Sequence, residues 1–220
     1  MKVHVALGLD GARAATGHAV IVDVFRAFTT AAFCIAAGAR ETVLLADHEE
    51  ALRMKAHDAS LFLSGEIEGK PIPGFDVGNS PSAIERLDLT GRRVVQRTSS
   101  GTQGVVAASR ARAILLGSLV IANATARYLG RVANDVTIVA MGPNDEGRNE
   151  DVVCAEHIAA LLKGERPAPP DIYMVGDHAA SGWPEWFPRR DAELACEVDR
   201  FDFALPVARE KGLLVARAAR

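Results

Sequence analysis

The sequence predicts an α/β protein in which helices cover both faces of a mostly parallel sheet, a three-layer α/β/α arrangement. Short runs of Val, Ile and Leu alternate with longer helix-forming stretches over most of the 220 residues. These runs lack the polar alternation of half-exposed strands, as expected for a sheet that is buried on both faces. Alternating strands and helices imply right-handed crossovers between parallel strands. We expect one domain over residues 1–220, with a subdivision near residues 88–92 left open.

Strands are expected where aliphatic and β-branched residues run together. The first of them, HAVIVDV, carries the acidic residue Asp23 near its end. The segment IYMVGDH at 172–178 is one further candidate strand. The other expected strands cover residues 18–24, 42–46, 60–65, 92–98, 113–118 and 135–142.

Helices are expected between these strands, and several of them carry terminal signals. Asp47 can cap a helix through its side chain, and Gly38 and Gly130 can end helices. The helix that starts at Glu150 has acidic residues first and Lys163 near its end, which matches the helix dipole. The expected helices cover residues 25–39, 47–57, 101–111, 119–130 and 150–164.

The segment 66–82 interrupts the alternation, because it holds three Pro and three Gly within seventeen residues. A loop of this length inside a compact domain is usually functional or disordered. Ile72 and Phe75 favour an ordered loop that packs on the body of the protein. The segment 165–171 is a Pro-rich connection, and the tail from 181 onward is irregular.

The composition is that of an ordinary globular protein, with 49% hydrophobic and 24% charged residues. A net charge of −3 gives no indication of nucleic-acid binding, which usually needs a positively charged surface. No apolar stretch is long enough to span a bilayer, and the N-terminus lacks a signal-peptide core. Cys34, Cys154 and Cys196 form no C-x-x-C pattern and are expected as ordinary small apolar residues. We therefore expect a cytoplasmic protein without nucleic-acid or membrane partners.

Aromatic residues are clustered in the tail, where Trp183, Trp186 and Phe187 lie close together between prolines. Such residues could anchor a subunit interface. Their commoner role is to cover the edge of a sheet. A homodimer is only slightly favoured on this basis.

The loop after the first strand is the first candidate for chemistry, because ligands bind outside the carboxyl ends of parallel strands. Asp23 ends a buried strand, where a carboxylate is costly unless a cation meets it. Arg26 follows, and Thr29 and Thr30 fall in the first helical turn, where N–H groups and hydroxyls can face an anion. The alternative is that Asp23 caps the helix and pairs with Arg26, and the two interpretations have about equal weight.

A second loop is rich in hydroxyl groups at another junction of strand and helix. It follows Arg97, and it lacks the lysine of a Walker motif. One helix cap needs one hydroxyl, so four of them favour a phosphate cradle over a simple cap. The residues of this predicted cradle are Thr98, Ser99, Ser100, Gly101 and Thr102.

The remaining candidates follow two other strands. Glu66 comes directly after a strand and could ligate a metal, whereas Glu68 is expected to be solvated. Asn79, later in the same loop, is a candidate for binding the substrate or its phosphate. Asp151 lies in the first turn of a helix, beside Glu150. Oxygen ligands without clustered His or Cys suit Mg²⁺ rather than zinc. We therefore predict a Mg²⁺ site made by Asp23 with Glu66 or Asp151.

Four segments together resemble the 2-phosphosulfolactate phosphatase family. They are VIVDVFRAFTT, GEIEGKPIPGFDVGNSP, RTSSGT and EDVVCA, and their order and spacing agree with the family. The late segment CEVDRFDFALPV is also similar. The resemblance covers nearly the whole chain and implies a three-layer α/β/α phosphatase that depends on Mg²⁺. The reaction it implies releases phosphate from 2-phosphosulfolactate, or a related small 2-phospho-acid, to give 3-sulfolactate on the way to coenzyme M.

Two mechanisms are hypotheses at this point: Asp23 acts either as a Mg²⁺ ligand or as a nucleophile that forms an aspartyl-phosphate. Arg26 and the loop at 98–102 bind the anionic groups of the metabolite. The sequence departs from the family pattern at 97–102 and at 141–150. These departures motivate an alternative, a non-catalytic or retasked module that binds a small sulfonated or phosphorylated metabolite.

Overall fold

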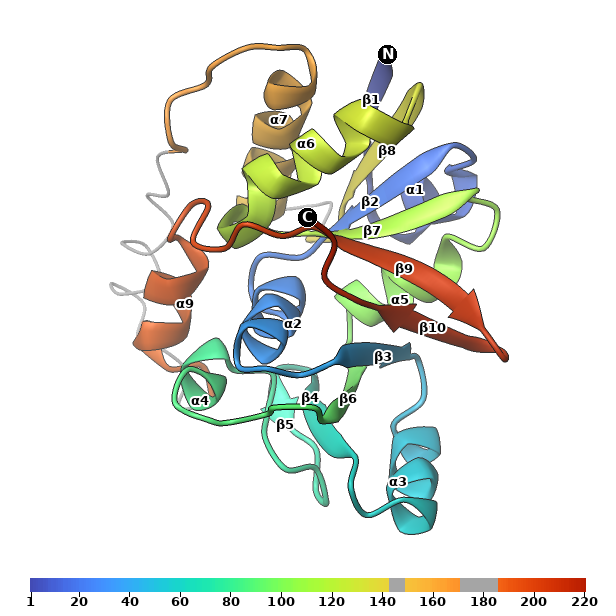
Figure 1. The fold of residues 1–220 in the computed structure, drawn as a ribbon, viewed down its shortest axis with the longest axis vertical. Helices are drawn as coiled ribbons and strands as arrows, with labels where there is room; N and C mark the ends of the chain where they lie inside the picture. The colour runs from blue at the N-terminus through green and yellow to red at the C-terminus, as the bar shows by residue number, and fades with distance from the viewer. Residues whose placement is uncertain (143–148, 171–185) are drawn as a thin grey trace.

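The computed structural model describes residues 1–142, 149–170 and 186–220, which form a ten-stranded sheet with helices on both faces (Figure 1). The strand order is β1-β8-β2-β7-β9-β10-β3-β6-β4-β5. The strands are β1 (Lys2–Leu7), β2 (His18–Val22), β3 (Glu41–Leu45), β4 (Phe62–Ile67), β5 (Lys70–Pro71), β6 (Arg93–Arg97), β7 (Ala113–Gly117), β8 (Asp135–Ala140), β9 (Leu205–Glu210) and β10 (Leu213–Ala216). The helices are α1 (Gly8–Ala14), α2 (Ala27–Ala36), α3 (His48–His57), α4 (Pro81–Ile84), α5 (Gly101–Ala107), the 3-10 turn η1 (Leu119–Ile121), α6 (Ala122–Val132), α7 (Glu150–Leu162) and α9 (Arg189–Ala195).

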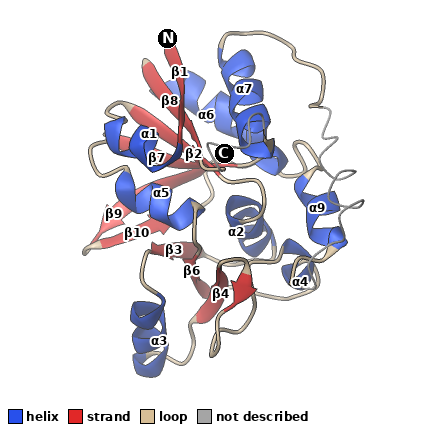
Figure 2. Ribbon diagram, turned by 180° about the vertical axis from the view of Figure 1, so that it is seen from behind, coloured by secondary structure: helices blue, strands red, loops and turns tan. Residues whose placement is uncertain are grey.

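The predicted three-layer arrangement is confirmed by the alternation of side chains along the strands. In β2, Ala19 and Ile21 face a core beneath α1, α2 and α5, whereas Val20 and Val22 face a second core beneath α6 and α7. Farther along the sheet, a third core lies beneath α3. Figure 2 shows α1 and α5 side by side over the sheet, where the two helices are in contact. A sheet buried on both faces explains why the strands are continuously apolar.

The sheet contains two groups of parallel strands that an antiparallel hairpin joins. One group is β1, β8, β2 and β7, and the other is β3, β6 and β4. The hairpin β9–β10 pairs antiparallel with β7 on one side and with β3 on the other. The two groups therefore run in opposite directions. A twist of about 20–25° per strand turns them by roughly 100–125° over the five steps from β2 to β6, so their carboxyl ends can still meet.

The elements expected between residues 18 and 164 are all present, and their ends move by a few residues. The helix expected over 25–39 is α2, and the one expected over 119–130 begins with η1. The long segment 66–82 is mostly irregular, as predicted, although it contains the two-residue β5 and the start of α4, where Ser80 caps the helix and Pro81 occupies its first turn.

Outside the segment 66–82, five elements were not expected: β1, α1, α9, β9 and β10. The sequence analysis assigned no element to β1 and α1, and it called the tail irregular where the hairpin β9–β10 forms. β1 is an edge strand whose side chains are mostly exposed, so it lacks the apolar run of the central strands. β9 and β10 are recognisable only through their pairing with β7 and β3. The candidate strand at 172–178 lies outside the described residues.

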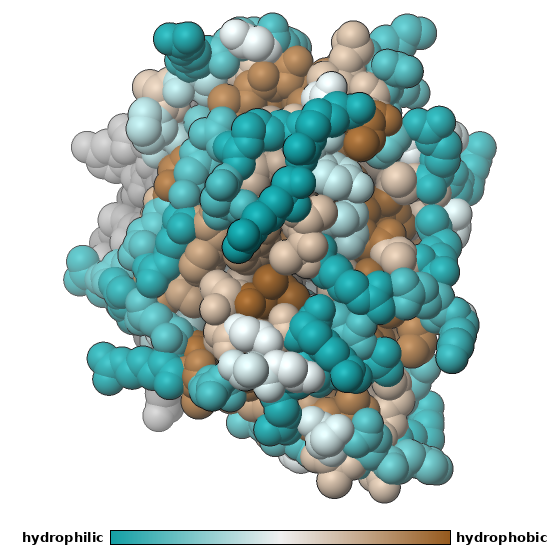
Figure 3. Space-filling model, viewed as in Figure 1, coloured by the Kyte–Doolittle hydropathy of each residue, from teal (hydrophilic) through white to brown (hydrophobic). Residues whose placement is uncertain are grey.

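The chemistry of the surface and of the cysteines follows the composition. Cys34 and Cys154 are buried in the core, as predicted. In the described part of the chain, no helix is long and apolar enough to cross a membrane. Apolar residues form separate patches between hydrophilic ones on the face shown in Figure 3. The predicted homodimer stays a prediction.

Candidate active site

Asp23 follows β2 directly, and its carboxylate lies inside the protein, with 5% of the residue exposed. One carboxylate oxygen accepts a hydrogen bond from the backbone N–H of Ala27, the first residue of α2, at 2.9 Å, although the N-cap position itself is occupied by Arg26. The N–H of Gly101 donates to the same carboxylate. Burial, together with the negative charges of Glu150 and Glu66, raises the pKa of Asp23 from 3.8 to about 7, although the hydrogen bonds from the backbone oppose this rise. A cap alone does not explain this concentration of negative charge.

Asp151 reaches Asp23 from the first turn of α7. Its Oδ1 accepts a hydrogen bond from the N–H of Val24 at 2.6 Å, and the N–H of Gly142 also donates to it. Burial raises the pKa of Asp151 well above its ordinary value, and the charge of Asp23 raises it further. Two buried carboxylates this close together favour either a shared proton or a bound cation. The structure thus brings together two of the three predicted metal ligands.

The donor set fits Mg²⁺ better than a metal that needs a closed protein cage. Among the residues that the structure describes, no three His, Cys, Asp or Glu side chains form a group that could hold a metal ion alone. Mg²⁺ commonly takes one or two carboxylates and completes its shell with water and substrate phosphate. Asp23 and Asp151 can provide that pair, and the metal itself stays a prediction.

Glu66, the third predicted ligand, connects two of the candidate loops. Its carboxylate accepts hydrogen bonds from the N–H of Gly69 at 2.6 Å and from the N–H of Ser99 at 2.5 Å. The Ser99 hydroxyl donates to it as well, at 3.1 Å. Three donors therefore converge on this carboxylate. In the structure Glu66 holds the loops after β4 and β6 together.

The hydroxyl-rich loop uses its side chains mainly for hydrogen bonds within the protein. The Thr98 hydroxyl accepts from the N–H of Thr102 at 3.0 Å, and the Thr102 hydroxyl donates to the Thr98 carbonyl at 2.9 Å. The Ser100 hydroxyl donates to the carbonyl of Met141 at 2.9 Å. The number of hydroxyls in this loop does not by itself indicate a phosphate site, because each of the four forms a hydrogen bond with another group of the protein. Their contact with an anion stays a prediction.

Gly101 lies where the second loop touches the first. A side-chain carbon at this position would lie 2.7 Å from the Cβ of Ala27 and 2.8 Å from Oδ2 of Asp23. Only glycine allows so close an approach. This contact places the start of α5 directly against the Asp23 carboxylate.

The threonines of the first loop point into the core. The Thr29 hydroxyl donates to the carbonyl of Val24 at 2.8 Å and contacts the Ser118 hydroxyl at 2.7 Å. The Thr30 hydroxyl is buried and has no hydrogen-bond partner in the described part of the chain. These contacts give Thr29 a structural role, and ligand binding by either residue is untested.

Arg26 does not pair with Asp23, which was one of the two expectations. It is buried and forms an ion pair with Asp191 of α9, with 2.8 Å between Nη1 and Oδ2. Its other contacts are the carbonyls of Trp186 and Gly69, at 3.3 and 3.4 Å, and the ring of Phe187, whose centroid is 4.3 Å from the guanidinium carbon.

Asp191 was missed by the sequence analysis. It lies in the irregular tail, in the first turn of a short helix, where acidic residues are common for reasons of helix dipole alone. No motif in the sequence marks it. It also binds the loop that carries Asn79, because it accepts hydrogen bonds from the Ser80 hydroxyl and the Ser82 N–H at 2.8 and 2.9 Å. Asn79 itself is buried, and its Oδ1 has no partner among the described residues.

Arg97 ties the ends of three strands together. Its Nε donates to the carbonyl of Ala46 after β3 at 3.0 Å, and its Nη1 donates to the carbonyl of Glu66 in β4 at 2.8 Å. These bonds give Arg97, one of the positions where the sequence departs from the family pattern, a structural role. They hold the carboxyl ends of β3, β4 and β6 in place.

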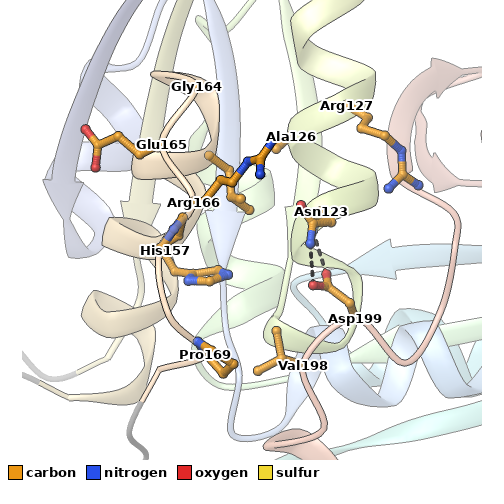
Figure 4. Close-up of a pocket in the computed structure, with 12 residues that line it drawn as sticks. Asn123, Ala126, Arg127, His157, Gly164, Glu165, Arg166, Pro169, Val198 and Asp199 are labelled. Carbon is orange, nitrogen blue, oxygen red and sulfur yellow. Dashed lines mark hydrogen bonds between the residues drawn. The ribbon is translucent and has the colours of Figure 1, made fainter.

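A cavity of about 530 Å³ lies elsewhere, between α6, α7 and the segment after α7 (Figure 4). One wall is Asp199, whose carboxylate accepts hydrogen bonds from the N–H and the side-chain amide of Asn123, at 2.7 and 2.5 Å. None of the predicted site residues lines it. Its volume therefore does not bear on the chemistry at Asp23.

The fold and the site together define a class, the α/β proteins whose small-molecule site lies in loops at the carboxyl ends of strands. Here the loops after β2, β4, β6 and β8 converge on buried carboxylates and backbone N–H groups. The chain belongs to the 2-phosphosulpholactate phosphatase family, whose model matches residues 8–181.

Curated relatives agree with this membership. The chain is 34% identical over 162 residues to a "Probable 2-phosphosulfolactate phosphatase" of Caldicellulosiruptor saccharolyticus, a match that covers 71% of this chain and 66% of the relative. Proteins of the same name from Carboxydothermus hydrogenoformans and Deinococcus radiodurans are 35% and 40% identical over 167 and 146 residues. These two matches cover 76% and 66% of this chain, and 69% and 61% of the relatives. The chain thus matches about two thirds of the length of these relatives.

Proposed function

We propose that this chain is a phosphatase that hydrolyses 2-phosphosulfolactate, or a related small 2-phospho-acid, to 3-sulfolactate and phosphate. Family membership supports the reaction. The observation that carries it is the pair of buried carboxylates, Asp23 and Asp151, at the carboxyl end of β2. Such a pair is costly to the fold unless it serves a cation or a proton transfer.

Mg²⁺ would be held by Asp23 and Asp151. When bound there, it would polarise the phosphoryl oxygens and stabilise the charge of the leaving alkoxide. Glu66 accepts three hydrogen bonds, so we assign to it the placement of Ser99 and a negative charge near the metal rather than direct ligation.

The residues around this pair would orient the substrate. The guanidinium of Arg26 retains N–H donors beyond its contacts with the residues that the structure describes, and a guanidinium binds phosphate, sulfonate and carboxylate groups well. Backbone N–H groups of the converging loops, including those at Gly101 and Gly142, keep the two carboxylates fixed. Fixed carboxylates keep the position of the metal, and hence of the phosphoryl group, constant through the reaction.

Two mechanisms are compatible with Asp23 in this place. In one, water attacks phosphorus, and a Mg²⁺ held by Asp23 and Asp151 would supply Lewis-acid activation. In the other, the Asp23 carboxylate attacks and forms an aspartyl-phosphate. The stereochemical course at phosphorus, followed with a chiral thiophosphoryl substrate, separates them: inversion supports a single direct attack by water, and retention supports an aspartyl-phosphate, which needs two successive displacements.

A second candidate function is a retasked module that binds a small sulfonated or phosphorylated metabolite without turnover. The hydroxyls of Thr98 and Thr102 are hydrogen-bonded to backbone groups of their own loop, and this observation motivates the alternative. Phosphate release from a panel of 2-phospho-acids, with Mg²⁺ and with EDTA, discriminates the two. Release that needs Mg²⁺ supports the phosphatase. Thermal stabilisation by the same compounds without release supports the binding module.

We propose a cytoplasmic location, since the substrate is a small charged metabolite, and a homodimer as the oligomeric state. Sedimentation velocity at micromolar concentration tests the second proposal directly. A single species at the monomer mass would contradict it.

A further inference from the structure

The ion pair between Arg26 and Asp191 joins two parts of the chain that are far apart in the sequence. The two side chains are almost fully buried, with 4% and 0% of their surfaces exposed. A buried charge pair rarely adds stability over an apolar pair of similar size, so its presence calls for a reason other than folding. Asp191 also lies beyond the stretch that matches the family model, which ends at residue 181.

Asp191 uses both carboxylate oxygens. Oδ2 accepts from Arg26, and Oδ1 accepts from the Ser80 hydroxyl and the Ser82 N–H. The Ser80 and Ser82 contacts fix the end of the loop that begins at Glu66. Asp191 therefore connects Arg26, from the first candidate loop, to the third.

The aromatic residues before α9 complete the setting of Arg26. Phe187 lies against its guanidinium, and the carbonyl of Trp186 accepts from Nη1. The Trp186 ring also packs against Gly69, where a side-chain carbon would lie 2.2 Å from the ring. Gly69 in turn accepts from Nη2 of Arg26 through its carbonyl at 3.4 Å. The ring contact and the hydrogen bonds together fix the orientation of the Arg26 guanidinium.

Among the described residues, these contacts occupy only some of the N–H donors of the Arg26 guanidinium. Arginine has five N–H donors. The two of Nη1 reach Asp191 and Trp186, and one of Nη2 reaches Gly69. The Nε–H and one Nη2–H have no partner among these contacts, and two donors suffice for a bidentate bond to an oxyanion.

We propose that Asp191 is a positioning residue for the reaction, which fixes the guanidinium of Arg26 so that its remaining N–H donors meet an anionic group of the substrate. This inference rests on the proposed function. Asp191 does not touch the substrate. The segment after residue 185 thereby completes a site that the family match alone does not contain.

The test is a double-mutant cycle with Asp191→Asn and Arg26→Met. The amide of Asp191→Asn presents N–H groups where either Arg26 or Ser82 needs an acceptor, so the guanidinium loses its fixed place. Misplacement by about 1 Å can cost about 100-fold in rate. We expect kcat/KM for 2-phosphosulfolactate to fall by about that factor in Asp191→Asn, and the double variant to be no slower than Arg26→Met.

The matched control is Glu85→Gln, which removes a carboxylate that binds Arg190 and Arg200 near the same helix without contacting Arg26. It should keep wild-type kcat/KM. If Asp191→Asn lowers kcat/KM equally in the wild-type and the Arg26→Met backgrounds, Asp191 does not act through Arg26 and the inference is overturned. A lower melting temperature with unchanged kcat/KM in Asp191→Asn would overturn it too, since that is the behaviour of a purely structural pair.

A binding measurement separates this inference from the proposed function. In a Trp183→Phe background Trp186 is the sole tryptophan, and its fluorescence can follow a titration with inorganic phosphate. If the wild type releases no phosphate from substrate, the proposed function fails. The inference about Asp191 then stands if Asp191→Asn weakens phosphate binding only when Arg26 is present, and falls if the affinity is unchanged.

Discussion

Asp151 lies in the first turn of α7, where burial and the negative charge of Asp23 raise its pKa while its Oδ1 accepts a hydrogen bond from the N–H of Val24. The two residues are 128 positions apart in the sequence. Their proximity is the central feature of the candidate site, because each carboxylate makes the other harder to ionise unless a cation is present.

Replacing Asp23 by Asn should abolish catalysis while keeping the fold. We expect phosphate release with Mg²⁺ to fall by at least about 10²–10⁴-fold, since the loss removes a metal ligand or nucleophile. The melting temperature without Mg²⁺ should stay the same or rise, because a buried charge is removed. The control is Asp10→Asn, whose carboxylate is almost fully exposed. Near-normal turnover by Asp23→Asn would rule out both proposed mechanisms.

Stability without metal should decrease as the pH rises. Asp23 ionises at about 7 in the folded protein but near 3.8 in the unfolded chain. The folded state therefore binds more protons than the unfolded state between these values, and the stability present below pH 4 is lost as the pH rises to about 7. One such group changes the unfolding free energy by about 1.4 kcal/mol per pH unit at most. Urea denaturation between pH 4 and 8 measures it, and Asp23→Asn should flatten the profile.

Magnesium should reverse that loss. Mg²⁺ should stabilise the folded protein by binding the ionised carboxylates of Asp23 and Asp151, for which protons compete. Its effect on the melting temperature should therefore be larger at pH 8 than at pH 5. Differential scanning calorimetry with millimolar MgCl₂ or EDTA gives the comparison. Equal melting temperatures with and without Mg²⁺ at pH 8, in wild type, would contradict the metal assignment.

Substitution of Gly101 by Ala should be far more harmful than its small size suggests. The added carbon would lie 2.8 Å from the Asp23 carboxylate and 2.7 Å from Ala27, so one of the two loops must move. We expect a loss of about 1–3 kcal/mol of stability and at least a tenfold drop in phosphate release. Gly130→Ala is the matched control: it lies in α6 with open space around it, and it should gain about 0.5–1 kcal/mol. Similar behaviour of the two variants would contradict the close approach at Gly101.

The Glu66→Gln variant tests how the loops after β4 and β6 are held. Its side-chain amide cannot accept from both the Gly69 and the Ser99 N–H groups as the carboxylate does. We expect about 1–3 kcal/mol of destabilisation in urea unfolding, whereas Glu68→Gln, at an exposed neighbour, should have no measurable effect. Retained Mg²⁺ stabilisation in Glu66→Gln would support the assignment of the metal to Asp23 and Asp151. Its complete loss would instead make Glu66 a direct ligand.

Much of the fold could be predicted because the strands of a buried parallel sheet are short runs of consecutive apolar residues, which can be recognised in the sequence. The central strands β2, β3, β6, β7 and β8 are short aliphatic runs, and their pattern is visible without any partner. β1 and the hairpin β9–β10 carry no such signal, since their place depends on which strands they join. The direction of the second strand group, opposite to the first, is likewise a property of that hairpin.

By itself, the sequence determined the α/β class, the candidate loops and the family, because apolar periodicity and short motifs are local properties. Only the tertiary structure decided which of those loop residues meet. In the folded protein Asp151 lies near Asp23, and Glu66 accepts a hydrogen bond from Ser99. Arg26 forms its ion pair with Asp191 and not with Asp23. The physical reason is that charges buried in a fold must find partners nearby in space, and spacing along the chain does not reveal which partners those are.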